Sequence, residues 1–329
     1  MKPVLKVAGI IALALVAVLA AGVVYLSVKK PAQRAASSER IEPTPERLAR
    51  GKYLVHHASD CLGCHSDHDN TFSFPVKAGT EGAGGFAWDA SADFPGFLAA
   101  SNITSDRETG LGSWTDGEIL RAIREGVDRE GKALFPIMPY KHFRNMSDDD
   151  AKAVVAYLRT LPPVRRAVAQ KKLDFPLNFI EKFVPQPLAA PVAHPDPKNS
   201  IAYGKYLTRI GGCYECHTPH DDKGELDEAR AFAGGWEMKG PWGRNITSNI
   251  TPHPETFVGR ATREEFIGRF HATLPDVVPP KGRNTIMPWR ALSGMTAEDL
   301  GAIYDYLKTV PPVENKVNAF PDATANEER

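Results

Sequence analysis

Cys61-Leu62-Gly63-Cys64-His65 and Cys213-Tyr214-Glu215-Cys216-His217 are the two stretches that decide the fold, and together they hold all four cysteines of the chain. In a Cys-x-x-Cys-His motif the two thiols add across the vinyl groups of a haem, and the adjacent histidine is placed to ligate the iron. A redox disulfide needs no following histidine, and a four-cysteine zinc site would have to join motifs about 150 residues apart. We therefore predict two covalently bound haem c groups. Their attachment residues are Cys61, Cys64, Cys213 and Cys216, and their first iron ligands are His65 and His217.

The sequence around these motifs is duplicated, with an offset of 147 to 153 residues between the two copies. A repeat of this length indicates tandem duplication of one domain with small insertions. The matching segments are Gly51-Lys52-Tyr53-Leu54 with Gly204-Lys205-Tyr206-Leu207, Ser101-Asn102-Ile103-Thr104 with Ser248-Asn249-Ile250-Thr251, Ile137-Met138-Pro139-Tyr140 with Ile286-Met287-Pro288-Trp289, and Tyr157-Leu158 with Tyr306-Leu307.

Each copy is helical where its periodicity can be read. A Thr-x-x-Glu capping box precedes an apolar run in both copies, and a last helix is expected behind Ser147 and behind Thr296. A Pro-Pro pair ends each last helix, because proline cannot continue it. No stretch alternates like a strand over any length, so we predict an all-α fold. The capping boxes are Thr115 with Glu118 and Thr262 with Glu265.

The N-terminal segment from Val7 to Val28 carries no charge and is long enough, as a helix, to cross a bilayer. A cleaved signal peptide is the rival interpretation, but its apolar region is usually shorter, and Lys29 and Lys30 stand where small residues would be expected. We favour a retained single-pass anchor. Haem c is attached on the outer side of the energy-conserving membrane, so we expect a bacterial inner-membrane protein with its body in the periplasm. Acidic and basic residues balance at 40 each, so nothing indicates nucleic acid as a partner.

Each iron needs a second axial ligand if it only passes electrons, and methionine or histidine is usual. We favour Met138 and Met287, because both lie in Ile-Met-Pro loops whose proline restrains the backbone. Met146 and Met295 also match each other, but they directly precede predicted N-caps, where an apolar residue packs back onto its helix. Two histidines, each three residues beyond a motif histidine, are the remaining rivals. They are His68 and His220.

The resemblance of this chain to a known family rests on three segments: Asn102-Ile103-Thr104-Ser105-Asp106, TGLGSWTD at 109–116, and Ile137-Met138-Pro139-Tyr140. They resemble the cytochrome c subunit of membrane-bound alcohol and sugar-acid dehydrogenases. The resemblance covers most of residues 45–315, although the second copy lacks the Gly-x-Gly-x-Trp portion and those subunits usually carry three haem domains. It implies class I cytochrome c domains with His/Met haems, and it places the Asn-Ile-Thr loop and the tryptophan near the haem propionates. The matching residues are Asn102, Trp114 and Asn249.

We therefore expect two tandem class I cytochrome c domains behind an N-terminal transmembrane helix. The division is 1–30 membrane anchor, 31–45 tether, 46–161 first domain, 162–198 proline-rich linker, 199–315 second domain and 316–329 tail. Composition predicts that the tether is flexible, and a short helix is expected in the linker around residues 177–184.

The predicted function is electron relay between a periplasmic dehydrogenase and an oxidase or cytochrome of the respiratory chain, without catalytic residues of its own. The alternative is a dihaem peroxidase-like oxidoreductase with one open haem site. It is disfavoured because both copies offer a Met-Pro loop. A third interpretation is a scaffold subunit that mainly docks an enzyme to the membrane.

Overall fold

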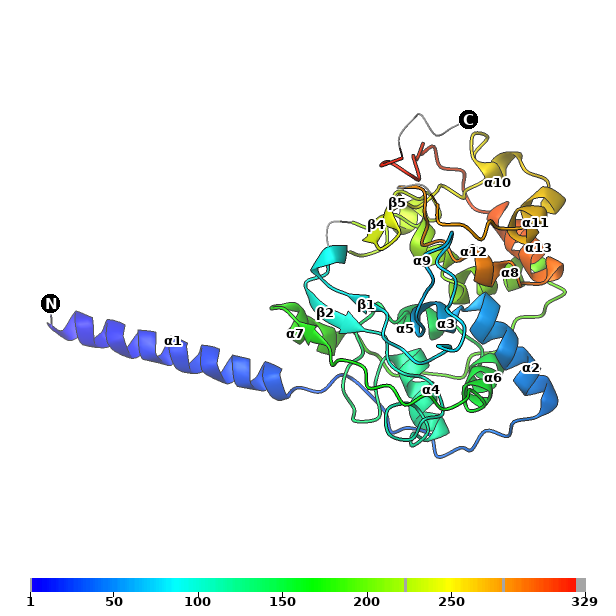
Figure 1. Ribbon diagram of the computed structural model, residues 1–329. Coiled ribbons are helices and arrows are strands. Elements are labelled where there is room, and N and C mark those ends of the chain that lie inside the picture. Colours follow the sequence, from blue (N-terminus) through cyan, green and yellow to red (C-terminus); the bar gives the residue numbers. More distant parts are fainter. Residues whose placement is uncertain (1, 222–223, 280–281, 324–329) are drawn as a thin grey trace.

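The computed structural model describes residues 2–221, 224–279 and 282–323, and it shows one long helix projecting from a rounded body (Figure 1). The body contains a first half (residues 45–161), a connector (162–198) and a second half (199–315). The first half contains helices α2 Pro45–Tyr53, α3 Cys61–Cys64, α4 Asp116–Glu125, α5 Tyr140–Phe143 and α6 Asp148–Leu158, the short helical turns η1 Leu54–Ala58 and η2 Ala90–Ala92, and strands β1 Ala87–Trp88 and β2 Gly96–Ala99.

The second half repeats this plan with helices α8 Ser200–Ile210, α9 Cys213–His217, α10 Phe257–Arg260, α11 Arg263–His271, α12 Trp289–Leu292 and α13 Ala297–Leu307, the turn η4 Glu228–Arg230, and strands β4 Glu237–Gly240 and β5 Gly243–Ile246. In each half the helix ahead of the Cys-x-x-Cys-His motif packs against the last helix, α2 on α6 and α8 on α13. A buried glycine allows each crossing, because a Cβ on Gly51 would lie 2.0 Å from the Ala153 carbonyl oxygen and one on Gly204 would lie 1.8 Å from that of Ala302. Buried residues of both halves join in one hydrophobic cluster.

The predicted helix starts are confirmed. Thr115 and Thr262 each form a complete capping box, and Ser147 and Thr296 accept a backbone N–H at the start of the last helices. Both methionines ahead of these last helices pack in the core, with at most 3% of their surface exposed. They are Met146 and Met295. This packing agrees with the prediction that an apolar residue before the N-cap packs back onto its helix.

The prediction of an all-α fold holds only in part, because the chain also contains short strands that were not predicted. Strands β1 and β2 pair antiparallel, and β2 pairs on its other edge with β3 Lys172–Leu173 of the connector. Strands β4 and β5 form a hairpin in the second half. These strands have two to four residues, too short for an alternating pattern to stand out in the sequence.

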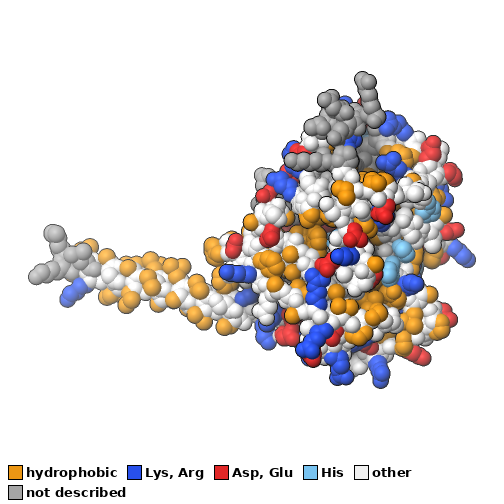
Figure 2. Space-filling view, in the orientation of Figure 1, with side chains coloured by type: hydrophobic (Ala, Val, Ile, Leu, Met, Phe, Trp, Pro, Cys, Tyr) orange, Lys and Arg blue, Asp and Glu red, His pale blue; other side chains and the backbone are white. Residues whose placement is uncertain are grey.

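Helix α1 Lys2–Val28 contains the apolar stretch Lys6–Val28, which has a mean hydropathy of 2.9 and no buried residues (Figure 2). It is the one helix of the described chain that is long and apolar enough to cross a membrane.

The predicted flexible tether, residues 31–45, instead lies against the first half. Arg34 forms an ion pair of 2.7 Å with the buried carboxylate of Glu125. Ile41 is 7% exposed, and its backbone N–H donates to the Asp116 carboxylate at 2.8 Å. Composition indicated a flexible segment because the segment is polar, but these partners lie far away in sequence and could not be seen in it.

The connector contains the expected short helix, as α7 Leu177–Ile180 followed by the turn η3 Glu181–Phe183. The tail runs beside β5: Ile246 donates its N–H to the Ala319 carbonyl, and Arg244 pairs with Asp322. Residues 324–329 of the predicted tail lie outside the described residues.

Candidate haem sites

Both Cys-x-x-Cys-His motifs form a single helical turn that begins after a residue in the left-handed conformation. In the first motif that residue is Asp60, with φ of 41°, and its carboxylate accepts the backbone N–H of Gly63. In the second motif it is Gly212, with φ of 74°. Aspartate and glycine are among the residues that tolerate this conformation. After this left-handed residue, both cysteines of a motif lie on one short helix, α3 or α9, and the histidine lies at the end of that helix.

The two motif histidines have the same hydrogen bond. The Nδ1 atom of His65 lies 2.6 Å from the Ser101 carbonyl oxygen, and that of His217 lies 2.7 Å from the Ser248 carbonyl oxygen. A carbonyl can only accept, so Nδ1 carries the proton and Nε2 keeps a lone pair for a metal. Burial lowers the pKa of both imidazoles, which favours the neutral, ligating form. Both serines begin the repeated Ser-Asn-Ile-Thr segments.

A second repeated element, which the sequence comparison missed, supports each motif. The backbone N–H of Gly84 donates to the His65 carbonyl oxygen at 2.8 Å, and that of Gly234 donates to the His217 carbonyl oxygen at 2.7 Å. Both glycines have positive φ, of 74° and 67°. A Cβ on Gly84 would lie 2.6 Å from the Ala100 carbonyl oxygen, so no side chain fits. The signal was available in the sequence as Ala-Gly-Gly-aromatic at residues 83–86 and again at 233–236.

The four thiols fit covalent attachment of a group. They form no disulfide in the described chain. Burial raises the pKa of Cys213 to about 11 and that of Cys216 to about 12, so both are protonated thiols at neutral pH. Cys64 of the first motif adds to the rise at Cys216, after its nearer neighbours Glu215 and Cys213. The two motifs are therefore neighbours across the junction between the halves.

Other contacts support this closeness. A Cβ on Gly211 would lie 2.9 Å from the Ala58 carbonyl oxygen, so the chains entering the two motifs touch. The buried His142 of the first half forms an ion-pair contact with Glu215, the residue between the two cysteines of the second motif. His220 lies 3.4 Å from the same carboxylate. His142 has no counterpart in the second copy, so the repeat gave no signal for this contact.

Glu215 is ionised at neutral pH. Burial by itself would raise the pKa of its carboxyl group, but the contacts with His142 and His220 outweigh burial and lower the pKa to about 2. A negative charge therefore lies inside the second motif, whereas the first motif has Gly63 at the same position.

The favoured methionines Met138 and Met287 are half-buried and pack against the core cluster, just ahead of α5 and α12. The loop of Met287 is fixed by the other half, because Ser73 donates its hydroxyl to the Met287 carbonyl oxygen at 2.8 Å. The rival Met146 and Met295 lie in the core, as described above.

The asparagines of the repeated loops are buried and have protein partners. The Asn102 amide donates to the Val164 carbonyl oxygen at 2.7 Å, and the Asn249 amide donates to the Val313 carbonyl oxygen at the same distance. Each asparagine side-chain oxygen accepts from the threonine two residues later. These bonds tie the loop that holds the motif histidine to the chain after the last helix. Trp114 is half-buried against the core.

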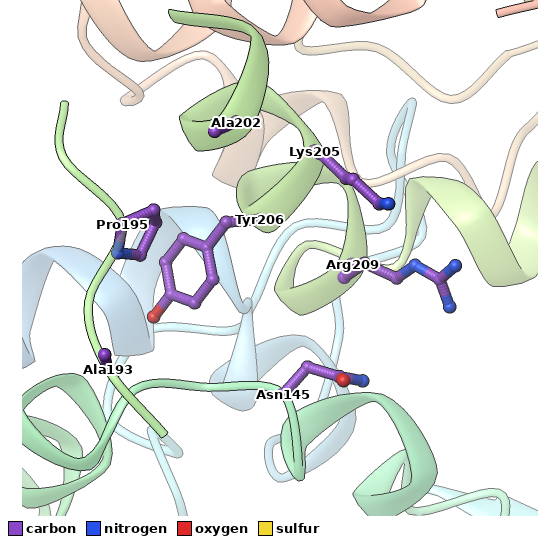
Figure 3. A pocket seen from close by; sticks show the side chains of 7 residues that line it. All are labelled: Asn145, Ala193, Pro195, Ala202, Lys205, Tyr206 and Arg209. Carbon is purple, nitrogen blue, oxygen red and sulfur yellow. The ribbon is translucent and has the colours of Figure 1, made fainter. Parts of the chain in front are cut away.

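An open pocket of about 420 Å³ lies where the connector meets the second half and Asn145 of the first half, and no motif residue lines it (Figure 3). The Tyr206 ring lies beside Pro195, while Lys205 and Arg209 extend away from it. None of the predicted haem-attaching or iron-ligating residues lines this pocket.

A sequence model described as Cytochrome c, a family that binds haem c covalently, matches residues 48–162. The chain is 35% identical over 199 residues to one subunit of the nicotinate dehydrogenase of Pseudomonas putida, with 59% of this chain and 16% of that protein aligned. It is 30% identical to the gluconate 2-dehydrogenase cytochrome c subunit of Pantoea cypripedii, with 80% of this chain and 59% of that subunit aligned. It therefore spans less than two thirds of either relative.

A relative of more similar length is a dihaem c-type cytochrome of Cereibacter sphaeroides. The two are 31% identical, and the alignment covers 78% of this chain and 84% of that cytochrome. These matches confirm the resemblance to dehydrogenase cytochrome subunits that the sequence motifs indicated. The chain belongs to the cytochrome c family.

Proposed function

We propose that this protein is a membrane-anchored dihaem cytochrome c that relays electrons from a periplasmic dehydrogenase to the respiratory chain. The observation that carries the proposal is the identical histidine geometry in two halves that meet at their motifs. His65 and His217 each have Nδ1 bonded to a serine carbonyl and Nε2 free. Two such sites side by side in one chain favour passage of an electron between them.

The domains follow from this assignment. We propose that residues 46–161 and 199–315 each form a cytochrome c domain, joined by the linker at 162–198. Each haem, when bound, supplies a one-electron couple whose potential depends on its axial ligand and its surroundings. The thioether positions are Cys61 with Cys64 and Cys213 with Cys216.

The residues of the chain hold and orient these groups. The Ser101 and Ser248 carbonyls fix the two ligating imidazoles, and we propose Met138 and Met287 as the second axial ligands. Asn102 and Asn249 act as positioning residues, because their amides hold the histidine-orienting loops. The family resemblance predicts that three residues lie near the haem propionates, and this stays a prediction. They are Asn102, Trp114 and Asn249.

The partners are proposed from the relatives. Those relatives are named as subunits of nicotinate and gluconate dehydrogenases, so we propose a dehydrogenase as the electron donor and an oxidase or another cytochrome as the acceptor. Helix α1 would remain as a single-pass anchor in the bacterial inner membrane, with the haem domains in the periplasm. Its apolar stretch of 23 residues supports this placement.

The test is an optical spectrum of the holoprotein with a haem-to-protein ratio, extended to the near-infrared band of methionine-ligated ferric haem. Two haems per chain are expected, both with the methionine band. Met138→Leu and Met287→Leu should each remove half of that band, whereas the matched controls Met146→Leu and Met295→Leu should leave it. One methionine haem beside a high-spin haem that binds carbon monoxide would favour the peroxidase-like alternative, and absence of covalent haem would overturn the proposal.

A further inference from the structure

The connector exposes large apolar side chains beside the end of α1. Phe175 is 80% exposed, and Ile180 and Phe183 are each 50% exposed. They belong to α7 and its two flanks, which form the edge of the body nearest to α1 (Figure 1). Hydrophobic side chains gather at this edge, next to Lys or Arg side chains (Figure 2). We call residues 172–184 the connector edge.

Two contacts fix the connector edge to the last turn of α1. The Lys182 ammonium donates to the carbonyl oxygens of Leu26 at 2.7 Å and Ser27 at 2.9 Å. The Lys29 ammonium lies 4.9 Å from the centre of the Phe183 ring. The last carbonyls of a helix have no partner within it, and a cation there also matches the negative end of the helix dipole. The connector edge is therefore held at the level where α1 ends.

That level coincides with the membrane surface if α1 spans the bilayer. The apolar stretch Lys6–Val28 has 23 residues, which as a helix rise about 35 Å, against about 30 Å for the hydrocarbon core. Its last turn then reaches the outer boundary, where Tyr25 is 59% exposed. Aromatic and basic side chains favour this boundary zone.

The charges around the connector edge are mostly basic. The connector edge contributes Lys182 and the exposed Lys172, and the chain just after α1 contributes Lys29 and Lys30. Among the acidic residues of the connector edge, Asp174 is exposed, but Glu181 is buried and bonded to Lys171. The excess of positive charge fits a surface of anionic lipid headgroups.

We propose that the connector edge is a second membrane contact, in which Phe175, Ile180 and Phe183 insert among the headgroups of an anionic bilayer beside the anchor. This inference rests on the proposed anchor. The contact would limit rotation of the body about the end of α1, which a single-pass anchor alone would leave free.

The test is photo-crosslinking to lipid in the full-length holoprotein, reconstituted in phosphatidylcholine vesicles with or without phosphatidylglycerol. Phe175→p-benzoylphenylalanine and Phe183→p-benzoylphenylalanine should give lipid adducts, detected by mass. The matched control is Phe257→p-benzoylphenylalanine, because Phe257 is 43% exposed on α10, on a part of the body far from α1 (Figure 1). Leu15→p-benzoylphenylalanine, within α1, reports on the anchor itself.

We expect adduct yields at Phe175 and Phe183 several-fold above that at Phe257, and higher with phosphatidylglycerol than without it. Adducts at Leu15 with none above control at Phe175 and Phe183 would overturn the second contact and leave the anchor standing. Adducts at those positions with a protein instead of lipid would overturn it as well. No adduct at Leu15 would overturn the anchor, and with it this inference. Equal yields in both vesicles would overturn the role of anionic headgroups.

Discussion

The Tyr53 hydroxyl donates to the Asp299 carboxylate at 2.7 Å, across the junction between the two halves. The mirrored bond joins Tyr206 to Asp150 at 2.6 Å. Each hydroxyl also accepts the N-cap backbone N–H of the same helix, at 3.3 and 3.2 Å. Both tyrosines come from the repeated Gly-Lys-Tyr-Leu segment, and both aspartates occupy the third position of a last helix. The duplicated halves therefore meet in an approximately two-fold arrangement, in which each contact occurs twice.

Tyr53→Phe and Tyr206→Phe should weaken this junction. Each change leaves a buried carboxylate without one of its donors, and a hydrogen bond to a charged group contributes about 1.5–3 kcal/mol. We expect each variant to lower the free energy of unfolding in urea by about that amount. The matched control is Tyr304→Phe, whose hydroxyl bonds to the Ala261 carbonyl at 2.8 Å within the second half. If the free energy of unfolding falls no more in Tyr53→Phe and Tyr206→Phe than in Tyr304→Phe, the two tyrosines do not stabilise the junction beyond an ordinary hydrogen bond.

Acid should weaken the same junction through Asp150. Burial alone would raise the pKa of Asp150, but the Arg50 guanidinium, bonded to both its oxygens at 2.8 Å, and the Tyr206 hydroxyl together lower it. A lowered folded-state pKa means that this stabilisation is complete above the ordinary value of 3.8 and is lost as the pH falls through the folded-state value. We expect the free energy of unfolding to drop below about pH 4.

The measurement for that prediction is urea unfolding of the holoprotein at a series of pH values. Asp150→Asn should be less stable at neutral pH and should flatten the curve in the acid range. Asp149→Asn, at an exposed neighbour on the same helix, is the control and should follow the parent chain. If the free energy of unfolding falls equally with decreasing pH in Asp150→Asn and in the parent chain, Asp150 is not the source of the acid sensitivity.

Local signals in the sequence predicted local structure well. Thr115 and Thr262 begin helices as capping boxes, because cap and partner are only three residues apart. Both Cys-x-x-Cys-His motifs likewise form one short helix each, α3 and α9, whereas the haem attachment and iron ligation that they predict stay predictions. Interactions between the halves could not be predicted, because the partners of Tyr53 and His142 belong to the other copy and no periodic pattern marks them.

One difference between the copies was visible in the sequence, but its consequence was not. Ten positions separate Gly51 from Cys61, whereas nine separate Gly204 from Cys213. The extra residue is accommodated in the π-helical turn Leu54–Ala58, where the Ser59 N–H reaches back five residues. A loop could have absorbed the same insertion, so the spacing alone did not decide the outcome.

Gly84→Ala should damage the first site as well as the fold. A Cβ there would meet the Ala100 carbonyl oxygen and the Asn102 nitrogen at 2.6 Å, on either side of the Ser101 carbonyl that orients His65. We expect a loss of stability of more than about 3 kcal/mol, or a failure to fold with haem. The control is Gly79→Ala, which has a similar φ of 83° but nothing within 4 Å, and should lose about 1 kcal/mol. Thermal unfolding followed at the haem band measures both, and equal losses would contradict the close approach.

Glu215→Gln should raise the reduction potential of the second haem only. The Glu215 carboxylate, with its pKa lowered to about 2, places a negative charge between the two attaching cysteines, and a nearby negative charge favours the ferric state. A unit charge ~10 Å away at an effective dielectric constant of ~20 contributes about 1.7 kcal/mol, or roughly 70 mV for a one-electron couple. Redox titration of the parent chain and the variant at the same pH measures the change at each haem. Glu225→Gln, at a side chain 71% exposed in the same half, is the control and should shift neither haem. A shift of both haems, or a fall at the second, would contradict the placement of iron beside the second motif.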